Sequence, residues 1–159
     1  MRKHCLYTNN NHKMNVSYKI LKAEKLIFQF YEGTVTLQNL FEFQAYLTLD
    51  PNYENQDALI DIRNADICIL PTEVQGMIEI FNSIKGGKER KLGIVLSPVY
   101  CQLLLALLCK NKNRLNIDLE FFRNKKDALR WLGKQELRVS LKNIINEARM
   151  EHKLVCYSY

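Results

Sequence analysis

The feature of this sequence that most constrains its fold is the alternation of short apolar runs with segments of helical periodicity. The runs are four to six residues long and rich in β-branched and aromatic residues, which is typical of strands. From the second run on, each is followed by a segment with apolar residues every three or four positions. The order β-β-α-β-α-β-α-β-α predicts an α/β fold, with a single mixed, mostly parallel sheet and helices packed against it. We expect strands at 18–21, 26–31, 58–62, 92–96 and 117–122, and helices beginning near residues 37, 71, 97 and 124.

Turn and cap residues separate these elements. Leu26, Phe28 and Phe30 alternate with Ile27, Gln29 and Tyr31, and the turn 23–25 makes the first two strands a hairpin. Gly33 is expected to end the second strand, and Ser97–Pro98 to begin the third helix. Thr36 and Asn124 stand where helix N-caps belong, and Gly133 suits the left-handed residue that closes a helix.

The two ends of the chain lie outside this pattern. Residues 1–16 are rich in Asn and lack periodicity, which predicts a flexible tail before an α/β domain at 17–133. Residues 134–159 contain an extra amphipathic helix and a tail, whose last residues, 154–159, are a strand or a frayed end. The helix's apolar face is a candidate surface for docking a partner, and the alternative is that it packs on the chain's own sheet. This face is made of Leu137, Leu141, Ile144 and Ile145.

Composition restricts the setting. No apolar run reaches the roughly 18 residues of a membrane span, and no secretory signal follows Met1. The five cysteines include no Cys-x-x-Cys, so neither a zinc site nor a disulfide framework is expected. These features predict a cytoplasmic protein without a metal or cofactor.

The charge is unevenly distributed. Residues 1–84 carry 7 Lys and Arg against 10 Asp and Glu, whereas residues 85–159 carry 16 against 7. Such asymmetry is compatible with an anionic partner, and the alternative is that these charges simply form a solvated surface. Nucleic acid is not expected, because the basic clusters lack interleaved aromatic residues or a recognition helix. An unidentified protein partner or a second copy of the chain is expected instead, and an anionic lipid is the alternative.

No catalytic set is recognisable. The histidines, His4, His12 and His152, all lie in the terminal regions, and no Gly-x-Ser-x-Gly is present. Gly86–Gly87 follows a helix and precedes a strand, the wrong end of the sheet for a phosphate loop. We therefore predict no catalytic residues and no enzyme, although an unidentified reaction stays open because carboxylates and Ser97 could converge.

Polar residues follow three of the expected strands. In open α/β sheets, ligands bind at the carboxyl ends of the strands. We predict a ligand site there, made of Arg63, Asp66, Ser97 and Arg123. The alternative is that Arg63 pairs with Asp61.

Five stretches of the sequence match the pattern of a known family: 31–36, 58–66, 91–95, 120–123 and 126–133. They resemble the STAS-fold family, in its branch similar to stage II sporulation anti-anti-sigma factors. The resemblance implies a mixed sheet covered by helices and a binding role in place of catalysis. Members that switch partners carry a phosphorylatable Ser at the position that follows the strand of Asp61 here. In this sequence Cys68–Pro71 occupies that place, with Thr72 as the nearest hydroxyl and candidate phosphorylation site, or simply a first-turn residue.

These observations predict a non-catalytic, STAS-like interaction module with a regulatory role. The alternative is a protein that binds a lipid or small anion, at the strand ends or through its basic C-terminal helix.

Overall fold

The computed structural model describes residues 12–84, 89–97, 102–151 and 153–158. Gly86–Gly87, Pro98, Cys101 and His152, on which sequence predictions were made, lie outside these residues, as do residues 1–11. The strands are β1 (His12–Leu21), β2 (Leu26–Val35), β3 (Asp57–Ile67), β4 (Lys91–Val95), β5 (Asp118–Phe122) and β6 (Lys153–Ser158). The helices are α1 (Leu37–Leu47), α2 (Val74–Asn82), α3 (Gln102–Lys110), α4 (Lys125–Trp131) and α5 (Leu141–Glu151). Short 3-10 turns are η1 (Pro71–Glu73), η3 (Lys112–Arg114) and η4 (Gln135–Arg138).

The strands form one mixed sheet in the order β5-β4-β3-β2-β1-β6. The pairs β2–β3, β3–β4 and β4–β5 are parallel, and β1 is antiparallel to both β2 and β6. The predicted α/β class and element order are confirmed. The end of the chain is a strand, β6, which adds an antiparallel edge to the sheet.

Strand β1 begins earlier than expected, at His12. The predicted tail is therefore wrong for residues 12–16. Met14, Val16 and Tyr18 alternate along β1 and are all buried, because they face the core that contains Phe43 and Leu47 of α1. Their alternation with polar residues was a strand signal in the sequence that the prediction of a tail overlooked.

Gly33 does not end β2, which continues to Val35. Gly33 has φ +79°, and a Cβ there would lie 2.3 Å from the backbone oxygen of Lys13. The glycine therefore lets β2 pass close to β1, where any side chain would clash with a backbone atom of the neighbouring strand.

The predicted helix caps are confirmed. Thr36 Oγ1 accepts a hydrogen bond from Asn39 N at 3.2 Å, and Asn124 Oδ1 accepts one from Asp127 N at 2.9 Å. Each cap satisfies one of the amide groups left unpaired at a helix N-terminus. Gly133 follows α4 in the left-handed region, with φ +70°.

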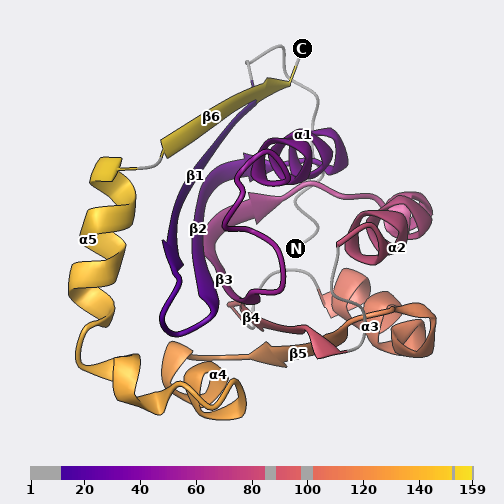
Figure 1. Ribbon diagram of the computed structural model, residues 1–159. Helices are drawn as coiled ribbons and strands as arrows, with labels where there is room; N and C mark the ends of the chain where they lie inside the picture. Colours follow the sequence, from indigo (N-terminus) through magenta and orange to yellow (C-terminus); the bar gives the residue numbers. More distant parts are fainter. Residues whose placement is uncertain (1–11, 85–88, 98–101, 152, 159) are drawn as a thin grey trace.

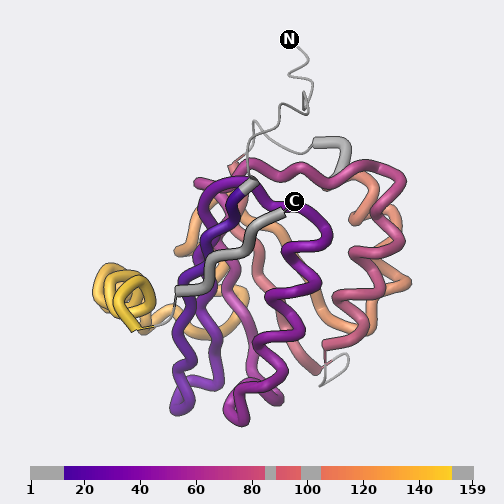
Figure 2. The backbone as a smooth tube through the Cα atoms, turned by 90° about the horizontal axis from the view of Figure 1, so that it is seen from above, coloured from indigo at the N-terminus to yellow at the C-terminus, as the bar shows by residue number. Residues whose placement is uncertain are grey.

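Helices cover both faces of the sheet (Figure 1). On one face, α1, α2 and α3 pack on side chains such as Tyr31, Ile60 and Leu92. On the other, α4 and α5 cover a core that includes Phe28 and Leu59. Figure 2 shows α5 on the opposite side of the sheet from α1.

The C-terminal helix packs on its own sheet. Leu137 and Ile144 are buried in the core that α4 and α5 cover together, and Leu141 and Ile145 are partly buried against it. Lys19 of β1 pairs with Glu147 and Glu151, and Arg149 Nη2 lies 3.3 Å from Glu32 Oε1. The apolar face that was predicted to dock a partner therefore packs on the chain's own sheet, which was the alternative prediction.

Candidate functional site

Three of the four predicted ligand residues lie at one level of three neighbouring strands, although Arg63 is inside β3, which was expected to end at residue 62 and continues to Ile67. Asp61 pairs with Val95, and Val95 pairs with Phe122, so β4 and β5 both end level with Asp61. Arg63, Ser97 and Arg123 lie just beyond these positions. Asp66 lies further along β3, opposite Thr34. The sheet thus brings the first three to one edge, but none of the ion pairs or hydrogen bonds among the described residues joins two of the four.

Arg63 is bound to Asp61, the alternative that the sequence left open. The Arg63 guanidinium donates through Nε to Oδ1 at 3.0 Å and through Nη2 to Oδ2 at 2.9 Å. Lys125 Nζ, at the start of α4, lies 3.2 Å from the same Oδ2. Asp61 is fully buried, so its carboxylate is held by two cations that reach it from β3 and α4.

The pKa of Asp61 is set by two opposing effects, its burial and its contacts with Arg63 and Lys125. Burial by itself raises the pKa of the carboxyl, because it disfavours the charged form. The hydrogen bonds from Arg63 and the charge of Lys125 act in the opposite direction and outweigh burial, so the pKa is lowered. Asp61 is therefore ionised at neutral pH.

Aromatic rings complete this charged cluster. Lys125 Nζ lies 5.8 Å from the ring centroids of both Phe28 and Phe30, and Arg149 Cζ lies 4.6 Å from that of Phe30. Such cation–π contacts add to the attraction that holds α4 and α5 on the sheet. Because the charges of Asp61, Arg63 and Lys125 pair with one another, we interpret the cluster as one that stabilises the fold.

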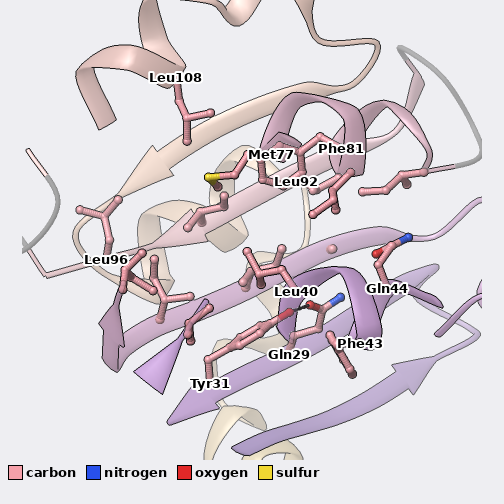
Figure 3. A pocket seen from close by; sticks show the side chains of 18 of the residues that line it. Gln29, Tyr31, Leu40, Phe43, Gln44, Met77, Phe81, Leu92, Leu96 and Leu108 are labelled. Atoms are coloured by element: carbon pink, nitrogen blue, oxygen red, sulfur yellow. Dashed lines mark hydrogen bonds between the residues drawn. The ribbon is translucent and has the colours of Figure 1, made fainter. Parts of the chain in front are cut away.

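The opposite face of the sheet holds a cavity of about 100 Å³, between β2–β5 and helices α1–α3. Figure 3 shows its side chains, which converge from the sheet and from the helices. Most of them are apolar. They include Leu40, Ile60, Met77, Phe81, Leu92 and Leu108.

Five lining residues carry polar groups: Gln29, Tyr31, Gln44, Tyr53 and Arg90. Tyr31 Oη donates to Gln29 Oε1 at 2.9 Å. Gln44 Nε2 donates to Tyr53 Oη at 2.5 Å, and the Arg90 guanidinium stacks 4.6 Å from the centroid of the Tyr53 ring. The cavity can therefore hold an apolar molecule and offers it a few fixed polar contacts.

The sequence did not predict this cavity. Its alternation correctly places Ile27, Gln29 and Tyr31 on one face of β2, and a glutamine between two apolar residues on a buried face was the available signal. The space itself depends on how helices from three parts of the chain pack on the sheet, and no short motif encodes that.

The remaining candidates are placed as follows. Thr72 is exposed in η1, directly before α2. Within the described ranges, no three His, Cys, Asp or Glu side chains are grouped to hold a metal ion. In the same part of the chain, no helix combines the length and apolar character needed to cross a bilayer.

No protein-family model and no curated protein matches this chain. It is similar to the crystal structure of an uncharacterised DUF3478-family protein with a SpoIIAA-like fold, from Shewanella loihica PV-4. The TM-score is 0.49 and the sequences are 19% identical, over 80% of this chain and 98% of that one.

Proposed function

We propose that this chain is a non-catalytic binding protein whose ligand is a small apolar molecule, or the apolar end of a larger one. The ligand site is the cavity between the sheet and helices α1–α3. The observation that carries the proposal is a partly open apolar pocket of about 100 Å³ between the sheet and the helices.

Such a space is energetically unfavourable when it is empty. Protein interiors pack as densely as organic crystals, and an unfilled cavity costs about 24 cal/mol per Å³. For a fully enclosed space of 100 Å³ the cost would be about 2 kcal/mol, which is an upper bound for this partly open pocket. Apolar cavities of roughly this size, about 150 Å³, stay dry and bind benzene. A molecule that fills the space therefore regains the missing contacts.

The other expectations from the sequence have less support. The apolar face of α5 is covered, and Arg63 of the predicted anion site is engaged by Asp61. An anionic lipid, a protein partner and a second copy of the chain stay predictions. The cavity, in contrast, has room for a ligand and a few polar groups to which a ligand can bind.

The proposal is tested by filling the cavity from its floor. Ala58, on β3, is buried and lines the cavity. In Ala58→Leu the added carbons occupy the space, so we expect stability to stay within about 1 kcal/mol of the original, or to rise. Toluene is the probe, titrated against methyl-labelled protein by NMR. We expect the original chain to bind it with a Kd of about 0.1–1 mM, with shifts at Ile60 and Met77, and the variant to lose this binding.

Ala128→Leu is the matched control. Ala128 is equally buried, but it belongs to α4 on the other face of the sheet, in the core that contains Leu129. Overpacking there is expected to destabilise the fold by about 1–3 kcal/mol and to leave toluene binding unchanged. Absence of toluene binding to the original chain, or equal binding to Ala58→Leu, would contradict the proposal.

A further inference from the structure

Gln29 is a buried amide in the wall of the apolar cavity. It lies on β2 between Ile27 and Tyr31 and is 5% exposed. Figure 3 shows its side chain beside that of Tyr31, with apolar residues of the sheet and of α1 around them. A leucine or isoleucine would suit this position better if its only task were to fill the core.

The amide's hydrogen bonds are incomplete. Its Oε1 accepts from Tyr31 Oη at 2.9 Å. Its Nε2 carries two N–H groups, and among the hydrogen bonds between described residues none is donated by this nitrogen. In the wall of an apolar pocket such a donor has few water molecules to bond to, so it gains from an acceptor that a bound molecule brings. A group of this kind facing a cavity is suited to an acceptor on a bound molecule.

Tyr31 holds the amide in place. The Tyr31 ring packs edge-on against Phe43 of α1, with centroids 5.7 Å apart and an interplanar angle of 89°. The ring position sets the position of Oη, which in turn orients the Gln29 amide. The donor is therefore oriented before a ligand arrives, which reduces the entropy lost on binding.

We infer that Gln29 Nε2 donates a hydrogen bond to an oxygen of the bound molecule, so that the ligand is an uncharged, mainly apolar compound with an acceptor such as a ketone or an ether. This inference rests on the proposed function of the cavity. A charged carboxylate or phosphate at Gln29 would need a cation beside it. Arg90 is the one charged residue of the described lining. Ile94 is level with Gln29 in the sheet, and Arg90 comes four residues before Ile94. The backbone of Arg90 is therefore displaced from that of Gln29 by roughly 13 Å along the strand direction.

The test uses two probes of nearly the same shape. Cyclohexanone carries a carbonyl oxygen where methylenecyclohexane carries a CH₂ group. Both are titrated by methyl NMR against the original chain and against Gln29→Leu. We expect the substitution to weaken cyclohexanone binding about tenfold and to leave methylenecyclohexane binding unchanged or slightly tighter.

A second measurement uses only the original chain, so it does not depend on whether a variant folds. In the original chain, the side-chain ¹⁵N–¹H resonances of Gln29 are expected to move downfield with cyclohexanone and not with methylenecyclohexane. Equal effects of Gln29→Leu on both probes, or unmoved amide resonances with bound cyclohexanone, would overturn the inference while the cavity remains a binding site. If neither probe binds the original chain, the proposed function itself fails.

Discussion

Replacing Asp61 by asparagine keeps the shape of a fully buried side chain and removes its charge. The carboxylate accepts from Arg63 Nε and Nη2 and lies 3.2 Å from Lys125 Nζ. In Asp61→Asn, one carboxylate oxygen becomes an NH₂ group, which faces donors that it cannot satisfy. Removing one partner of a buried ion pair costs about 3–5 kcal/mol when the remaining charge stays buried.

The exposure of the two cations lowers this figure. The Arg63 side chain is 38% exposed and that of Lys125 is 16% exposed, so Arg63 in particular recovers hydration when the carboxylate is lost. We therefore expect Asp61→Asn to reduce the free energy of unfolding by about 2–3 kcal/mol, measured by urea denaturation at pH 7. Asp66→Asn, at an exposed position of the same strand, is the control and is expected to cost less than about 0.5 kcal/mol.

The pH dependence gives an independent check. Because the pKa of Asp61 is lower in the folded state than in the unfolded chain, its stabilisation is present above the unfolded value, about 3.9. It is lost as the pH falls through the folded value. The difference in stability between the original chain and Asp61→Asn should therefore shrink as the pH falls below about 4. A cost below 1 kcal/mol at pH 7, or a pH-independent difference, would refute this account of the cluster.

Two further pairs of variants test the fold. Gly33→Ala would bring a Cβ to 2.3 Å from a backbone oxygen at positive φ and is expected to cost more than about 3 kcal/mol in urea denaturation. Gly133→Ala, with a similar φ but no atom within 4 Å, should cost only about 1 kcal/mol, and equal costs would contradict the clash. Ile144→Ala is expected to cost about 2–4 kcal/mol, because Ile144 of α5 is buried in the core between this helix and the sheet. Met150→Ala, 87% exposed on the same helix, should stay within about 0.5 kcal/mol, and similar losses for both would show that α5 does not pack as described.

Local chemistry explains which sequence predictions succeeded. Alternation along β2, the caps Thr36 and Asn124, and the left-handed Gly133 each depend on a few neighbouring residues, and all agree with the structure. The start of β1 and the role of Gly33 were misjudged. The alternation of apolar and polar residues along β1 was present in the sequence and was overlooked. The close approach of Lys13 to Gly33 could not be predicted from the residues next to either one.

The candidate site likewise has some features that the sequence predicted and others that it did not. The topology predicted that Arg63, Ser97 and Arg123 follow neighbouring strands, since parallel strands end at one edge. It could not predict that Lys125 joins Arg63 at Asp61, because this contact requires α4 to fold back over the sheet. Nor could it place Gln29 beside a space bounded by three helices.

The sequence by itself determined the class of fold, the order of its elements and most of their caps, because these follow from periodicity and from interactions between near neighbours. Only the tertiary structure decided where the apolar face of α5 is buried, which partner Arg63 takes, and where the interior leaves a cavity beside an incompletely bonded amide. Each of these depends on side chains that are distant in sequence, whose packing is set by the whole sheet and its helices together.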